Sequence, residues 1–327
     1  MQLVCCKIPL SDTVGRDCLK MKNRIKECFS VEQLRILQHK FVSLFLIFIL
    51  SVTLVGATKR PPAIKVPIFG FHDIVDATNP DENPPKRPKF DNDYSKQNLY
   101  AFLNYLVEKN YWLLSTQDLY TYFIKKSQPI PSEHLNQKAV MITFDDGYYS
   151  IYTNVLPILK DLERNYDKTA KVVLFVNPKT LGVNLEGYLP HITCYDLREG
   201  YKRGFYDIQS HTFSHQVLTK LGSEDLNLEL EQAKTELRQC TYDIDRNQWV
   251  AAHMAYPYGW VNKKVEKYLP KYHLTGYLYD GIISRPNRLR NPFRISRVRV
   301  NRFTTPRQLI KIAERATRIK QSNINKI

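Results

Sequence analysis

The pattern that most restricts the fold of this chain is a regular alternation of strand-like and helix-like segments. Short apolar runs are followed by segments whose apolar residues recur at helical spacing. Such an alternation favours a parallel sheet covered by helices, and the number of repeats suits a (β/α) barrel, open or closed. We find no internal repeat and no sign of a second domain. We therefore expect a single α/β domain over residues 64–318.

The expected elements follow one another through this domain. A stretch at 77–93 contains four prolines and many charges, which predicts a long exposed loop. The expected strands cover residues 64–71, 111–115, 139–144, 171–176, 205–209, 250–256, 274–279 and 294–300. The expected helices cover residues 96–109, 116–126, 151–163, 195–202, 223–240, 262–269 and 305–318.

A hydrophobic segment precedes the expected domain. Residues 41–58 are uncharged and mostly apolar, which is close to the lower limit for a bilayer span and long for the core of a signal peptide. Residues 1–40 carry eight Lys or Arg, so the positive-inside rule predicts a cytoplasmic leader and export of the domain beyond the segment. Both a transmembrane anchor and a signal peptide remain open, as does a start at Met21. We expect an exported protein, membrane-anchored or secreted to the periplasm, with a basic tail over 319–327.

The charge of the chain gives little support to a nucleic-acid partner. The formal net charge of +16 is spread along the sequence, and no helix-turn-helix, zinc-finger or RNA-binding signature accompanies it. Anionic lipids or an acidic polymer explain the sign equally well. Only Cys194 and Cys240 follow the hydrophobic segment, and a disulfide and two buried thiols are both open.

Two adjacent carboxylates follow the strand expected at 139–144. Asp145 and Asp146 stand directly before Gly147. Neighbouring residues on a strand point to opposite sides, so the two acids can serve one site in different roles only if the chain twists or bulges beside the glycine. By itself, the pattern is more typical of a strand that ends in a turn or a helix cap.

Two further groups of reactive residues also stand at strand ends. His211 and His215 have the spacing that lets two imidazoles on one helical turn reach a single metal ion, and an aspartate would complete a three-ligand set with open positions. Tyr256, Pro257 and Tyr258 form a turn that can aim backbone N–H groups at a ligand, and the tyrosines offer rings for stacking on a sugar. Each group alone would suit surface histidines or an ordinary turn. Barrel folds, however, collect catalytic groups at the carboxyl ends of their strands.

The motifs TFDDG, HTFSH and PYG, in this order, resemble the leading motifs of the NodB-type polysaccharide deacetylases, carbohydrate esterase family 4. The resemblance implies a distorted or incomplete (β/α) barrel and a hydrolase of carbon–nitrogen bonds other than peptide bonds. It implies that Asp145 is the catalytic base and that Asp146, His211 and His215 bind a divalent metal. The family uses zinc, nickel, cobalt or iron, and zinc is our expectation.

Two departures from the wider family point to one branch. Ala255 stands where the third motif commonly has an arginine, and residues 295–302 contain no histidine to act as a general acid. Both features resemble the poly-β-1,6-N-acetylglucosamine deacetylases (the PgaB/IcaB-like branch), whose barrel strands are circularly permuted. In that branch a His-Asp motif near the start of the domain places the acid. The resemblance therefore implies that His72 is the general acid.

The function implied by this resemblance is removal of N-acetyl groups from an exported N-acetylglucosamine polysaccharide of the biofilm type. Asp145 would take the proton of the attacking water, the metal and a backbone N–H near Tyr258 would stabilise the oxyanion, and His72 would protonate the leaving amine. The membrane and a polysaccharide-export machinery are expected partners. A peptidoglycan, chitin-type or O-acetylated substrate remains open, as does a glycan-binding module with weak catalysis.

The remaining histidines and a late group of arginines are expected to have no part in catalysis. The arginines should form a solvated strand face rather than a track for a polymer. The histidines are His39, His134, His191, His253 and His273, and the arginines are Arg285, Arg288, Arg290, Arg294, Arg297 and Arg299.

Overall fold

The computed structural model describes residues 35–36, 39–45 and 62–320, and the chain divides into two units after Pro61. In the first unit, residues 35–36 and 39–45 are helical. None of the helices in the described ranges is both long and apolar enough to cross a membrane. Most of the leader, residues 46–58 of the hydrophobic segment and residues 321–327 of the tail lie outside the described residues.

The second unit is built on a curled sheet in which all neighbouring strands are parallel. The edges of the sheet meet where Tyr277 forms a parallel bridge with Ile295, just before the last strand. This confirms the expected α/β fold, a distorted (β/α) barrel. In spatial order the strands are β10 (Val298–Arg299), β1 (Ile68–Phe71), β5 (Ala139–Phe144), β6 (Val172–Val176), β7 (Tyr206–Ser210), β8 (Met254–Ala255) and β9 (Gly276–Tyr277), with β4 (Trp112–Leu113) beside β5.

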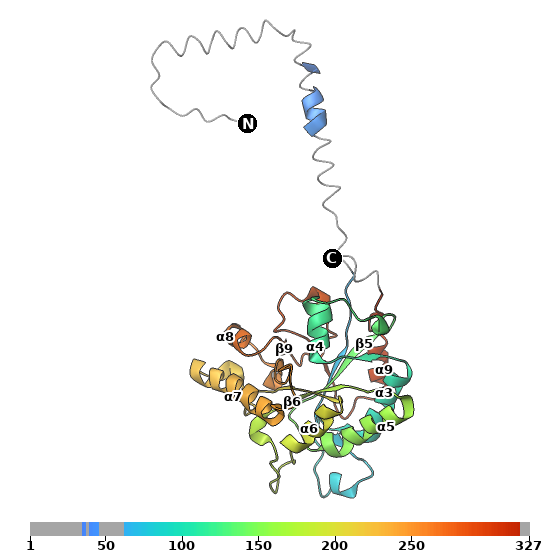
Figure 1. Ribbon diagram of the computed structural model, residues 1–327, viewed down its shortest axis with the longest axis vertical. Helices are drawn as coiled ribbons and strands as arrows, with labels where there is room; N and C mark the ends of the chain where they lie inside the picture. Colours follow the sequence, from blue (N-terminus) through green and yellow to red (C-terminus); the bar gives the residue numbers. More distant parts are fainter. Residues whose placement is uncertain (1–34, 37–38, 46–61, 321–327) are drawn as a thin grey trace. The chain divides into compact units, whose positions relative to one another are not determined.

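Helices follow the strands in the expected order. In Figure 1, α7 and α8 lie on one side of the strands, and α3, α5 and α9 lie on the other. The helices expected at 116–126 and 151–163 each contain a π-helical segment, over Leu119–Ile124 and Ile151–Val155. The α-helices are α3 (Lys96–Glu108), α4 (Thr116–Asp118), α5 (Leu156–Tyr166), α6 (Cys194–Lys202), α7 (Ser223–Thr241), α8 (Lys263–Tyr268) and α9 (Pro306–Ala313).

The strands separate two apolar layers because successive side chains point to opposite faces. On β5, Ile142 packs in the larger cluster beneath the helices, whereas Met141 packs inside the barrel. On β6, Leu174 and Phe175 divide in the same way. Both strands are buried on both faces, as is usual for parallel sheets, and this explains their continuous apolar sequence.

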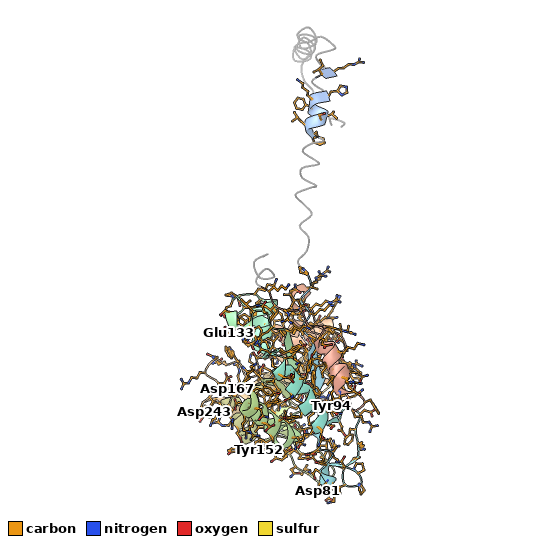
Figure 2. All side chains as sticks on the ribbon, turned by 90° about the vertical axis from the view of Figure 1, so that its right-hand side faces the viewer. Asp81, Tyr94, Glu133, Tyr152, Asp167 and Asp243 are labelled. Atoms are coloured by element: carbon orange, nitrogen blue, oxygen red, sulfur yellow. A yellow bond between two sulfur atoms is a disulfide. The ribbon has the colours of Figure 1, made fainter. Side chains whose placement is uncertain are left out.

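The carboxyl ends of the strands share one end of the barrel with the loop that follows β1. Figure 2 places Asp81, in this loop, and Glu133, which precedes β5, at opposite ends of the unit. The sequence predicted that this loop is exposed. The structure differs in part, because the Arg87 guanidinium is buried. It pairs with Asp73 at 2.5 Å and with Asp93 at 2.8 Å. These ion pairs attach the loop to the end of β1.

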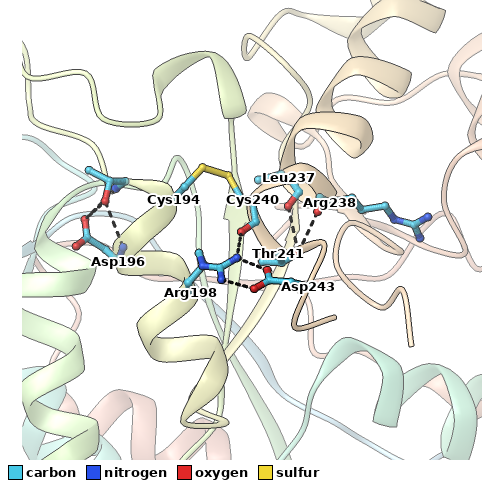
Figure 3. Close-up of a disulfide and its surroundings, with 9 residues drawn as sticks. Cys194, Asp196, Arg198, Leu237, Arg238, Cys240, Thr241 and Asp243 are labelled. Atoms are coloured by element: carbon cyan, nitrogen blue, oxygen red, sulfur yellow. Dashed lines mark hydrogen bonds and ion pairs between the residues drawn. A yellow bond between two sulfur atoms is a disulfide. The ribbon is translucent and has the colours of Figure 1, made fainter. Parts of the chain in front are cut away.

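A disulfide joins Cys194, at the start of α6, to Cys240, in the last turn of α7 (Figure 3). The same two helices are linked by Arg198, which donates to the Cys240 carbonyl oxygen at 2.9 Å and to both carboxylate oxygens of Asp243 at 2.5 and 2.7 Å. Of the two states left open by the sequence, the structure therefore has the disulfide.

Candidate active site

A cavity of 490 Å³ opens at the carboxyl ends of the strands. All the residues proposed from the sequence line it except Pro257, which is buried in the turn after β8. The structure therefore brings together side chains from the ends of six strands, β1, β5, β7, β8, β9 and β10. The lining residues are His72, Asn92, Asp145, Asp146, His211, His215, Tyr256, Tyr258, Gly259, Tyr279, Arg299, Val300 and Asn301.

The chain turns sharply between the two aspartates, so both reach this cavity. Asp145 still belongs to the sheet, since its N–H donates to the Phe71 carbonyl oxygen at 2.9 Å. Asp146 has a φ of +69° and Gly147 one of +73°. Left-handed backbone at a residue other than glycine costs about 1–3 kcal/mol and is concentrated at functional sites. The required twist beside Gly147 is present.

Asp146, His211 and His215 form a compact group of potential ligands. The Asp146 Oδ1 atom lies 3.4 Å from Nε2 of each histidine, and one ligand atom from each residue lies within 4.8 Å of the others. Burial lowers the pKa of His211 to about 4, although the nearby carboxylates oppose the shift, so this imidazole is neutral at pH 7. Its Nδ1 atom lies 2.9 Å from the Ala255 carbonyl oxygen and must carry the hydrogen, which leaves the Nε2 lone pair facing Asp146.

These three residues suit a divalent metal. Two imidazole nitrogens and one carboxylate oxygen are a set that zinc and neighbouring transition metals accept. Asp146 Oδ1 is also buried and has no hydrogen-bond partner among the described residues, as expected of an atom that awaits a cation. The group thus fits the ligand roles proposed from the sequence.

Residues outside the three motifs fix the histidine loop. Thr212 and His215 have φ values of +67° and +61°. The Asn177 side chain donates to the carbonyl oxygens of His211 and Thr212, and Glu229 on α7 accepts hydrogen bonds from the Ser214 N–H and hydroxyl. Sequence reasoning missed both residues, because an isolated Asn or Glu carries no motif. Such supporting contacts orient metal ligands.

Asp145 is held by Arg297. The guanidinium donates to Oδ1 at 2.6 Å and to Oδ2 at 2.8 Å, and it also contacts the Thr143 hydroxyl at 3.0 Å and the Leu278 carbonyl oxygen at 2.8 Å. Burial would raise the pKa of Asp145, but the charge of Arg297 holds it well below its usual range. Asp145 is therefore ionised and oriented, with His211 Nε2 3.9 Å away.

The expectation of a solvated arginine face was wrong for Arg297, whose side chain is completely buried. The segment runs along the inside of the barrel edge, so Arg297 points inward under Asp145, and Arg299 lines the cavity. The small side chain of Ala255, where the wider family has its arginine, is buried in the barrel core. The guanidinium beside Asp145 thus comes from the residue directly before the last strand, β10.

His72 enters the cavity from the end of β1. Its ring packs edge-on against Tyr279 at 5.3 Å, and its buried Nδ1 atom has no hydrogen-bond partner among the described residues. The Tyr279 hydroxyl donates to the carbonyl oxygens of Gly70 and Val300, at 3.3 and 3.2 Å, which fixes the ring against β1 and β10. The structure therefore places His72 in the same cavity as Asp145.

The turn after β8 gives its two tyrosines different surroundings. The Tyr256 ring is completely buried, and its hydroxyl donates to the Phe293 carbonyl oxygen at 2.8 Å, so the expectation that it stacks on a sugar was wrong. Tyr258 is exposed and contacts the His215 ring at 4.8 Å. Of these two tyrosines, Tyr258 alone offers its ring to a ligand.

Comparisons with known proteins indicate the family of this domain. Residues 132–277 match the sequence model of the family described as polysaccharide deacetylase. YxkH of Bacillus subtilis, which carries the name of a polysaccharide deacetylase, is 26% identical over 247 residues, covering 75% of this chain and 74% of YxkH. Residues 132–277 therefore belong to a polysaccharide deacetylase domain.

Solved structures share the fold of this deacetylase. The polysaccharide deacetylase BC0361 of Bacillus cereus superimposes with a TM-score of 0.61 at 22% identity, over 77% of this chain and 69% of BC0361. IcaB of Ammonifex degensii gives a TM-score of 0.56 at 19% identity, over 77% of this chain and 96% of IcaB. These likenesses establish the fold, and the match of residues 132–277 to the family model gives the class of enzyme.

The segment that matches the family model contains Asp145, Asp146, His211 and His215, but it ends before Arg297 and begins after His72. The site therefore combines residues of the matched segment with two residues that flank this segment within the same domain. No motif in the sequence marks Arg297. Its nearest signal is the alternation of arginine and valine over residues 297–300.

Proposed function

We propose that this deacetylase uses a divalent metal to remove N-acetyl groups from an exported N-acetylglucosamine polysaccharide. The observation that carries the proposal is the single cavity in which Asp146, His211 and His215 face one another beside an aspartate held by Arg297. The likeness in fold to IcaB and the position of His72 support the poly-N-acetylglucosamine branch over other glycans.

Each residue of the cavity has a task in this reaction. A divalent metal in the group of Asp146, His211 and His215 would act as a Lewis acid and make water a stronger nucleophile. Asp145, ionised and fixed by Arg297, accepts the proton of the attacking water. His72 donates a proton to the departing amine. Ala255, through its carbonyl oxygen, keeps His211 in the tautomer that binds a metal.

The proposal is tested with the purified full-length protein and N-acetylglucosamine oligomers. We expect acetate release, complete inhibition by a chelator, and an Asp145→Asn variant that keeps its metal but loses turnover. Undiminished acetate release by Asp145→Asn would refute the mechanism. Metal-free protein from metal-replete medium would favour a glycan-binding module. Release only from O-acetylated glycans, chitin or peptidoglycan would move the substrate to those classes.

We also propose that the deacetylase domain acts outside the cytoplasm, next to the membrane and the machinery that exports the polymer. The hydrophobic segment 41–58 and its basic leader support export, and the Cys194–Cys240 disulfide suits an oxidising compartment. Sequencing the N-terminus of the mature protein distinguishes a cleaved signal from an anchor. A reduced, cytoplasmic protein in cell fractions would contradict the proposal.

A further inference from the structure

Two exposed aromatic side chains follow β8: Tyr258, which lines the cavity, and Trp260, whose ring contacts that of Tyr258. Tyr258 is 54% exposed and Trp260 is 53% exposed. Their ring centroids lie 5.7 Å apart, and Tyr258 in turn contacts His215 at 4.8 Å. A row of three rings therefore runs from the metal-binding group to the outside of the cavity.

The backbone of the turn that carries these two rings has a fixed conformation. Tyr258 has a φ of +60°, in the left-handed region that is unfavourable for a residue with a side chain. Gly259 is required next to it, because a Cβ atom there would lie 2.7 Å from the Tyr279 N atom. The Trp260 N–H closes the turn by donating to the Pro257 carbonyl oxygen at 3.2 Å. The turn is thus fixed, and both rings point away from the core.

An exposed tryptophan next to this cavity indicates a place where a ligand can bind. Burying a large aromatic side chain is favourable by about 1.5–3 kcal/mol, and aromatic rings are the main contributors of binding energy at recognition sites. A pyranose ring has an apolar C–H face that matches the electron-rich face of an indole. A polymer with one sugar beside His215 and Tyr258 would bring its next sugar to Trp260.

We propose that Trp260 is a specificity-determining residue that stacks on the sugar adjacent to the one being deacetylated. This inference rests on the proposed function and makes the enzyme selective for linked sugars over the monosaccharide. Trp260 holds the polymer while Asp145 and the metal-binding group act on the neighbouring unit. Tyr258, closer to the cavity, contacts the reacting unit itself.

The chain supplies a matched control. Trp249 is 48% exposed, but it precedes β8 and thus lies toward the amino end of the strand, where its carbonyl oxygen accepts a hydrogen bond from Gln209. The third tryptophan, Trp112, is only 7% exposed. A change in tryptophan fluorescence on ligand binding can therefore be assigned to Trp260 or to Trp249 by replacing each of them in turn.

The first experiment measures acetate release by the metal-loaded, full-length protein on N-acetylglucosamine and on its pentamer. We expect Trp260→Ala to lower kcat/KM for the pentamer about tenfold, mainly through KM, which corresponds to about 1.4 kcal/mol. Trp260→Phe should retain most of the activity, and Trp249→Ala should match the wild type. An equal loss on monosaccharide and pentamer, or no loss on the pentamer, would overturn the inference.

The second experiment does not depend on turnover. The Asp145→Asn variant is titrated with the pentamer while tryptophan fluorescence is recorded. We expect a saturable change that persists with Trp249→Phe and disappears with Trp260→Phe. A change that depends on Trp249 instead, or no change at all, would refute the stacking role. Binding at Trp260 without any acetate release by the wild type would contradict the proposed function and leave this inference standing.

Discussion

Arg297 binds both carboxylate oxygens of Asp145 although the two residues are 152 positions apart in the sequence. Both side chains are buried, so water cannot replace either partner. A paired guanidinium keeps the carboxylate ionised and fixes its plane, at the expense of its basicity. The pair therefore links the geometry of the proposed base to the last strand of the barrel.

Arg297→Lys should reduce kcat by at least tenfold, because an ammonium cannot hold both oxygens in one plane. Arg297→Ala should lower the free energy of unfolding by about 3–5 kcal/mol, since it leaves a buried carboxylate unpaired. Steady-state acetate release and urea unfolding check the two effects. Arg294→Lys, in an ion pair with Glu266 near the surface, is the control and should change neither. A fully active Arg297→Lys enzyme would show that the orientation of Asp145 does not limit the reaction.

His72→Ala should lower kcat by about 10²–10⁴-fold, the usual contribution of a general acid, while metal content stays unchanged. Tyr279→Phe is the matched control, because it keeps the ring that contacts His72 and removes only the hydroxyl. A near-normal rate in His72→Ala would place the proton donor elsewhere in the cavity.

Removal of the metal should abolish turnover and leave the fold intact. His215→Ala should bind far less metal than the wild type because it removes one of three ligands. Elemental analysis of the purified protein, with acetate release after chelation and after metal addition, checks this. His134→Ala, whose ring stacks on Trp112 away from the cavity, should keep its full metal content. Equal metal content in both variants would exclude His215 as a ligand.

Loss of the disulfide should destabilise the protein without changing its chemistry. The bond closes a loop with a sequence separation of 46, and the chain-entropy model gives a stabilisation of about 4 kcal/mol for a loop of this length. The double variant Cys194→Ser/Cys240→Ser should therefore unfold at lower urea, with kcat unchanged. Reduction of the wild type should produce the same shift. An unchanged unfolding midpoint would show that the pair contributes nothing.

Mild acid should weaken the fold through two buried histidines. Burial and the charge of Lys234 lower the pKa of His253 and His273 to about 3, against an ordinary value of 6.5. Below pH 6.5 the unfolded chain takes up protons that the folded chain does not, so the free energy of unfolding falls as the pH decreases. The loss is roughly 2 kcal/mol per histidine at pH 5. Urea unfolding between pH 7 and pH 5 checks this, and His273→Gln should flatten the dependence.

Much of the architecture could be predicted from local pattern. Strand β5 has the expected bounds, and α3 begins at the expected Lys96, because an apolar run or an amphipathic stretch with a capping Ser95 is a local signal. Asp145, Asp146, His211 and His215 could be proposed because each stands at a strand end. The resulting cavity follows from parallel strands that end at one edge of the barrel.

Arg297 and Tyr256 could not be predicted in the same way. Whether an arginine near a barrel edge points to solvent or to a buried carboxylate depends on how the edges of the sheet meet, which is a property of the whole fold. The same holds for the Tyr256 ring, which fills space that exists only because Gly276 on the neighbouring strand has no side chain. Long-range packing decides both cases.

The position of Arg297 directly before the last strand also sets an order of events during synthesis. Chains grow from the amino end, so a chain that has reached residue 277 already contains every proposed metal ligand and Asp145. Its carboxylate is still without the guanidinium that orients it. During synthesis, the proposed metal ligands would thus be complete before Arg297 is added. The ability to hydrolyse substrate would come only after Arg297.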